Sequence, residues 1–149
     1  MNALDIEKFM SKALEMARVA YEYDEVPVGA VIVKEGKIIG RGFNQVIKKN
    51  IVTSHAELNA IADASKNIDN YRLIDCDMFV TLEPCHMCAK AIVDARLNHL
   101  YFGAREPKTG SIVSIDKFFD RKELNHSVNY SGGHFEELSS KLLKDFFQL

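Results

Sequence analysis

The start of the chain carries apolar side chains at the spacing of an amphipathic helix. Their recurrence at three- and four-residue intervals predicts a helix from about Asp5 to Tyr23, which ends before Pro27. Two runs of apolar and β-branched residues follow, over 29–33 and 37–43, and a short connection containing Gly36 separates them. This pattern is typical of a β-hairpin. We therefore expect one helix followed by two antiparallel strands.

Farther along, helical and strand-like patterns alternate. A strand, a helix and a second strand in sequence form a right-handed crossover between parallel strands, so the sheet should be mixed, with helices on both faces. The sequence predicts an α/β protein with three layers, α/β/α, and a mixed sheet of about five strands. The predicted elements are a loop over 45–53, a helix from His55, a strand over 77–82, a helix ending near Ala95, a strand over 99–103, a loop over 104–110, a short helix near 115–119, a strand over 127–130 and a helix over 135–147.

Composition favours a single intracellular domain. A chain of 149 residues buries about 70% of its unfolded surface in one core. No apolar run approaches the ~20 residues of a membrane span, and the first residues lack the order of a signal peptide. Three cysteines, an odd number, suit a reducing compartment better than a disulfide framework. We expect one cytoplasmic domain over residues 1–149.

The charge balance does not indicate a protein that is basic overall. The formal net charge is −2, which still leaves room for a local patch that contacts phosphates. Scattered basic residues most simply form an ordinary solvated surface. The candidates for phosphate contact are Arg41, Lys48, Lys49, Arg105 and Lys108.

Two short motifs together predict a catalytic zinc site. His55-Ala56-Glu57 supplies an imidazole, and Pro84-Cys85-His86-Met87-Cys88 supplies two thiols three residues apart. Three protein ligands leave the fourth position of a tetrahedral zinc ion to water, which is typical of catalytic rather than structural sites. Glu57 is not needed as a ligand and is placed to move protons. These residues indicate a hydrolase.

Each part of the site has a simpler explanation. Ser54 and Glu57 fit a capping box, in which Glu57 would only bind a backbone N–H group. The two cysteines could be a redox pair, and Cys76 could complete a structural site of one histidine and three cysteines.

Pro84 suits the first position of a helix, which would place both thiols on the first turn, where the helix dipole favours thiolate.

The chain resembles bacterial tRNA adenosine deaminases, a branch of the cytidine deaminase superfamily, over nearly its whole length. H-x-E followed by P-C-x-x-C is the signature of that superfamily. The segments that resemble the tRNA branch in particular are Glu25-Val26-Pro27-Val28-Gly29-Ala30-Val31, Asn70-Tyr71-Arg72-Leu73, Val80-Thr81-Leu82-Glu83-Pro84-Cys85 and Phe102-Gly103-Ala104-Arg105.

The resemblance implies a cytidine deaminase-like fold in a single zinc-dependent deaminase domain. The implied reaction is hydrolytic deamination of adenosine to inosine at the wobble position of a tRNA anticodon, by zinc-bound hydroxide with Glu57 as the proton shuttle. Zinc lowers the pKa of bound water from 15.7 to about 7. The resemblance also implies a homodimer with one Zn²⁺ per subunit and the active site close to the subunit interface.

Substrate contacts are inferred from the resemblance alone. Val28 and Asn44 should line the pocket for the target base, and Glu106, Lys108 and Asn125 should contact the nucleotide or its neighbours. An anticodon loop offers an unpaired base that can be splayed out at low cost. The chain departs from the usual family pattern in loops near the substrate, at Gln45-Val46, Ile51-Val52 and Glu106.

Two other functions fit the same motifs. A deaminase of a free nucleobase such as guanine or cytosine needs the same metal site but no phosphate contacts. A zinc-stabilised RNA-binding or scaffold protein would use the site structurally, although an intact Glu57 argues against this interpretation.

Overall fold

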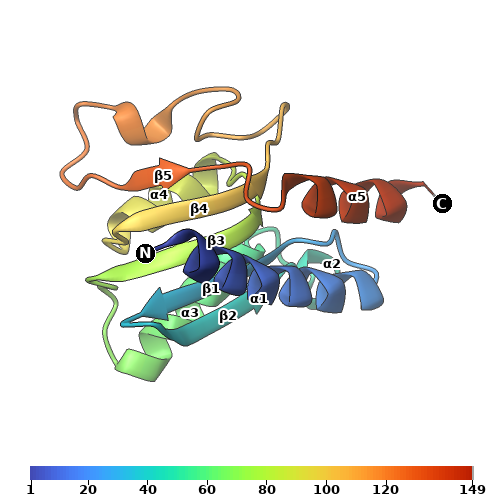
Figure 1. Cartoon of the computed structure of the whole chain (residues 1–149), viewed down its shortest axis with the longest axis horizontal. Helices are drawn as coiled ribbons and strands as arrows, with labels where there is room; N and C mark the ends of the chain where they lie inside the picture. Colours follow the sequence, from blue (N-terminus) through green and yellow to red (C-terminus); the bar gives the residue numbers. More distant parts are fainter. Residues whose placement is uncertain (149) are drawn as a thin grey trace.

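The computed structural model describes residues 1–148 and confirms the predicted three-layer architecture (Figure 1). Five strands form one sheet in the order β2-β1-β3-β4-β5. β1 (Gly29–Lys34) is antiparallel to β2 (Lys37–Phe43) and to β3 (Cys76–Leu82). β4 (His99–Ala104) is parallel to β3 and to β5 (Asn129–Ser131). The sheet is therefore mixed, as the hairpin and the crossover connection predict.

Helices cover both faces of the sheet. α1 (Ala3–Glu22) and α5 (Glu136–Phe147) contact each other on one side of the sheet; in Figure 1, α1 lies in front of the strands and α5 extends to the right of them. α3 (Ala56–Ile68) and α4 (His86–Asp94) lie on the other side. Within residues 1–148, none of the helices is both long and apolar enough to cross a membrane.

Three predicted elements differ from the structure. A four-residue helix, α2 (Val46–Lys49), forms inside the predicted loop over 45–53. It ends at Asn50, which adopts the left-handed conformation. The helix predicted near 115–119 is a single 3-10 turn at Phe118–Asp120, and β5 is shorter than the strand predicted over 127–130. Elements of three or four residues are too short to show a hydrophobic period.

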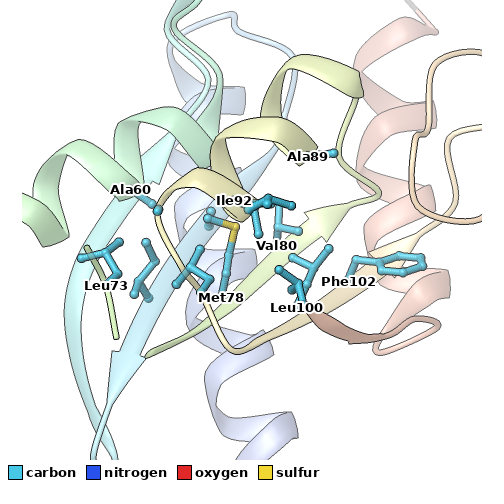
Figure 2. Packing of buried hydrophobic residues seen from close by; sticks show 14 of the residues in the cluster. Ala60, Leu73, Met78, Val80, Ala89, Ile92, Leu100 and Phe102 are labelled. Carbon is cyan, nitrogen blue, oxygen red and sulfur yellow. The ribbon is translucent and has the colours of Figure 1, made fainter. Parts of the chain in front are cut away.

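The apolar strands are explained by burial on both faces. Alternate side chains of β1 point to opposite sides, so Val31 packs in the cluster under α1 while Ile32 packs in the cluster under α3 and α4. The cluster under α3 and α4 also contains Met78 of β3 and Ile92 of α4, which Figure 2 shows close together. A continuous apolar run is thus the expected pattern for a strand in the middle layer.

One edge of the sheet gathers the segments that form the site. Leu82 of β3 pairs with Ala104 of β4, and Gly29 of β1 pairs with Phe43 of β2. The start of β1 and the ends of β2, β3 and β4 therefore lie together. Gly42 lets the start of α3 approach β2 closely, because a Cβ atom there would lie 2.3 Å from the carbonyl oxygen of Ala56.

Candidate metal centre

His55 is the residue that caps α3 at its N-terminus, but its side chain makes no capping hydrogen bond. Instead, the side-chain oxygen of Asn44 accepts from the N–H of Ala56 at 2.8 Å. The hydroxyl of Ser54 lies against the side chain of Asn59. The capping-box interpretation of Ser54 and Glu57 is therefore wrong, and His55 and Glu57 both remain available to the site.

The two cysteines lie at the start of α4. Cys85 is the N-cap residue and the helix begins at His86. The prediction that Pro84 takes the first helical position is therefore wrong, because Pro84 precedes the cap. The reason is that Cys85 itself has an extended backbone (φ −75°, ψ 175°). Cys88 lies in the first turn and is buried.

The three predicted ligands converge. Nδ1 of His55 lies 3.7 Å from Sγ of Cys85 and 3.5 Å from Sγ of Cys88. Tetrahedral zinc with ordinary Zn–N and Zn–S bond lengths places such atoms ~3.6 Å apart. The donor set and its spacing thus fit a zinc ion held by three side chains.

Cys76 does not belong to this group. It lies at the first residue of β3, whereas the segment carrying Cys85 follows the last residue, Leu82. The Cys76 thiol is buried and lies 3.4 Å from the carbonyl oxygen of Ile74. In residues 1–148, the atoms of His55, Cys85 and Cys88 form the only compact group of three potential ligands, so the structural site with three cysteines is wrong.

Hydrogen bonds among the three side chains favour the thiolate form of Cys85. Hydrogen bonds from Cys88 and then from His55 lower the pKa of Cys85 to about 4. The hydrogen bond to Cys85 raises the pKa of His55 and that of Cys88 above their usual values. Thiolate is the form of cysteine that binds metal.

Glu57 is almost fully buried beside the ligands, with 4% of its surface exposed. Burial raises the pKa of Glu57 to about 7, against the opposing effect of a backbone hydrogen bond and of nearby His55. A carboxyl group whose pKa lies near neutrality can both accept and donate a proton.

A cavity of about 300 Å³ opens onto this centre. Val28 and Asn44, two of the predicted substrate contacts, line it together with His55, Glu57 and Cys85. The cavity thus places a ligand-sized space next to the metal ligands and the buried carboxyl group. The remaining lining residues are Glu25, Val26, Val46, Ile47, Leu82, Glu83 and Thr109.

The other predicted substrate contacts lie outside the cavity lining. Glu106 and Lys108 belong to the loop that contributes Thr109, and the side chain of Glu106 accepts from the N–H of Lys108 at 3.0 Å. Asn125 lies beside Arg96, just beyond the C-terminal end of α4, whereas the cysteines are at its N-terminal end. The structure therefore does not bring Asn125 to the same cavity.

Some of the candidate basic residues gather near the cavity. Arg41 and Lys49 line a neighbouring hollow of about 340 Å³ together with Lys66. Lys48 belongs to α2, which contributes two residues to the wall of the first cavity, and its Nζ lies 4.3 Å from the centre of the Tyr23 ring. Arg105 and Lys108 are exposed on the loop after β4.

Two buried glutamates that the sequence did not single out hold the walls of the cavity. Glu83 accepts hydrogen bonds from the N–H groups of Glu106, Ile112, Val113 and Ser114. Burial alone would raise the pKa of Glu83, but these bonds and that from the Ser114 hydroxyl hold it below its usual value. Glu25 accepts from two N–H groups of α2. The only sequence signal for either was its place within a segment that resembles the tRNA branch of the deaminases.

The chain is similar to deaminases over nearly its whole length. A family model described as MafB19-like deaminase matches residues 4–149. The tRNA-specific adenosine deaminase of Haemophilus influenzae is 46% identical over 143 residues, which are 95% of this chain and 83% of that protein. The tRNA-specific adenosine deaminase of Aquifex aeolicus is 42% identical over 142 residues, which are 95% of this chain and 93% of that protein.

Solved structures agree with these sequence relationships. One, from a study of A-to-I editing by tRNA:A34 deaminases at the wobble position of transfer RNA, superposes with a TM-score of 0.88 at 43% identity. The match covers 91% of this chain and 99% of that one. A guanine deaminase from Nitrosomonas europaea superposes with a TM-score of 0.79 at 21% identity, covering 94% of this chain and 83% of that one. At that identity the likeness concerns the fold alone.

Proposed function

Because this chain belongs to the tRNA-specific adenosine deaminase family, we propose that it converts adenosine to inosine at the wobble position of a tRNA anticodon. The reaction consumes water and releases ammonia. The observation that carries the proposal is the convergence of His55, Cys85 and Cys88 beside the buried carboxyl group of Glu57, at the base of an open cavity.

His55, Cys85 and Cys88 would hold one Zn²⁺ in each subunit. When bound, zinc lowers the pKa of a water molecule toward neutrality and supplies the nucleophile of the reaction. The short distances between the ligand atoms support this assignment, since little rearrangement is needed to bind the ion. Cys85 and Cys88 are preorganised by the first turn of α4, and His55 by the hydrogen bond between Asn44 and Ala56.

Glu57 would transfer the protons that deamination requires. As oxygen adds to C6 of adenine, ring nitrogen N1 must gain a proton, and the exocyclic nitrogen must gain another before ammonia leaves. Glu57 lines the cavity and can take one proton from the attacking water and deliver it to N1. It can then take the second proton from the new C6 hydroxyl group and deliver it to the leaving nitrogen. General acid–base catalysis of this kind contributes roughly 10² to 10⁴ in rate.

Substrate binding would use both walls of the cavity. Val28 and Asn44 would contact the target base, and Glu106 and Lys108 would contact the nucleotide or its neighbours from the loop after β4. Asn125 would contact RNA at a separate place on the surface, since it lies beyond the other end of α4. The cavity is open to solvent, as a base that remains attached to an RNA chain requires.

The proposal includes a cytoplasmic homodimer. tRNA is the proposed partner, and a reducing compartment keeps Cys85 and Cys88 available as metal ligands. The resemblance noted from the sequence supports a dimer in which the active site lies near the subunit interface. The substrate contact inferred for Asn125 fits such an assembly, in which Asn125 would serve the site of the other subunit.

The test is a comparison of substrates. The zinc-loaded protein is incubated with a tRNA whose anticodon begins with adenosine, with the same tRNA carrying guanosine at that position, and with free guanine, cytosine and adenosine. We expect inosine only in the first reaction, as detected by mass spectrometry of digested RNA. Turnover of the free bases without inosine in the tRNA would overturn the proposal in favour of a nucleobase deaminase.

A further inference from the structure

α2 forms part of the cavity wall although the hydrophobic core does not hold it. None of the four residues of α2 is buried, and Ile47 is 70% exposed. Even so, Val46 and Ile47 both line the cavity that opens onto the metal centre. A one-turn helix is not stable by itself, so the position of α2 must depend on contacts with its surroundings.

The carboxyl group of Glu25 supplies the main contact. Its Oε1 accepts from the N–H of Ile47 at 3.0 Å and its Oε2 from the N–H of Lys48 at 2.7 Å. These N–H groups lie in the first turn of a helix, where no backbone acceptor is available within the helix. Each carboxyl oxygen of Glu25 thus satisfies one donor of α2.

Glu25 is itself held firmly. Its side chain is 1% exposed, and its own N–H donates to the carbonyl oxygen of Ala20 at 2.9 Å, at the end of α1. The preceding Tyr23 contributes a second contact, because Nζ of Lys48 lies over its ring. The end of α1 therefore forms a fixed support to which α2 is attached.

We infer that Glu25 is a positioning residue, which fixes α2 as one wall of the substrate cavity and thereby sets the affinity for RNA. This inference rests on the proposed function. Both oxygens of Glu25 are already engaged by backbone donors, so the group is poorly suited to proton transfer, which Glu57 performs. The outer side of the same segment exposes Lys48 and Lys49, so displacement of α2 would move basic side chains as well as the cavity wall.

The test compares Glu25→Gln and Glu25→Ala with Glu22→Gln, all in the zinc-loaded full chain. Glu22 is exposed at the end of α1 and provides the same change of charge three residues away. Loss of the hydrogen bonds should speed hydrogen exchange at the N–H groups of Ile47 and Lys48. For Glu25→Ala, KM for tRNA should rise about tenfold while kcat stays within about twofold, since binding lost equally from ground and transition states changes KM alone. Glu25→Gln retains one acceptor and should show a smaller rise, and zinc content should be unchanged.

Several results would overturn the inference. If the N–H groups of Ile47 and Lys48 exchange hydrogen no faster in Glu25→Ala than in Glu22→Gln, Glu25 does not hold α2. A fall in kcat without a change in KM would place Glu25 in the chemistry instead. If the wild-type protein failed to act on tRNA, the proposed function would fall, while the exchange measurement would still decide whether Glu25 anchors α2.

Discussion

At the scale of single residues, the proposed function assigns metal binding and proton transfer to different side chains. His55, Cys85 and Cys88 occupy helix starts, where their backbone positions are fixed by neighbouring hydrogen bonds. Glu57 lies in the first turn of α3 and is buried beside these ligands. A change at Glu57 should therefore affect turnover without affecting the ligands.

Glu57→Gln should retain zinc and tRNA binding but lose activity. Glutamine keeps the size of the side chain and cannot carry the transferred proton. We expect kcat to fall by roughly 10² to 10⁴ with little change in KM, as measured by inosine formation under multiple turnover. Glu22→Gln serves as the control for charge, and full activity of Glu57→Gln would refute the proton shuttle.

At the scale of elements, the cavity is built from segments with little regular structure. Glu83 holds the loop after β4 through four backbone N–H groups, and Glu25 holds α2 through two. Both carboxyl groups are buried. Such anchors let irregular segments keep a defined shape, because buried backbone donors that lack helix or sheet partners are satisfied by side chains.

The loop after β4 should contribute electrostatic affinity through Lys108. This side chain is exposed, two residues after Glu106, whose N–H is bound by Glu83. Lys108→Ala should weaken tRNA binding and reduce the slope of log K against log salt by roughly one, as expected for one lost phosphate contact. Titrations at several salt concentrations measure this slope.

Lys37→Ala is the matched control for Lys108→Ala. Lys37 is exposed at the first residue of β2, whereas the site lies beyond the last, Phe43. Its replacement should leave the slope unchanged. An equal slope for wild type and Lys108→Ala would mean that Lys108 belongs to the ordinary solvated surface.

At the scale of the whole molecule, the sequence predicts the layers better than the surroundings of the site. The long helices and the apolar strands were predictable because burial on one or two faces leaves a periodic pattern, as in β1 with Val31 and Ile32 on opposite sides. The convergence of His55, Cys85 and Cys88 was predictable because zinc chemistry restricts residue type and spacing. α2 was not, since the acceptor of its first N–H groups is Glu25, which lies 22 and 23 residues earlier in the chain.

Distances across the fold also decided the alternatives at the site. Whether Cys76 could join the ligands depended on its being at the other end of β3 from Leu82. Whether Ser54 and Glu57 formed a capping box depended on where α3 begins, and its N-cap residue is His55. The placement of Asn125 beyond the far end of α4 could not be deduced from motif spacing either, because it depends on the path of the chain between β4 and β5.

The zinc content of the purified protein and three variants tests the central claim most directly. We predict one zinc ion per chain in the wild type and in Cys76→Ser, because Cys76 lies outside the centre, and loss of zinc in Cys85→Ser and Cys88→Ser. Metal analysis after extensive dialysis supplies the number. A wild-type protein without stoichiometric zinc, or loss of zinc in Cys76→Ser, would contradict a centre formed by His55, Cys85 and Cys88.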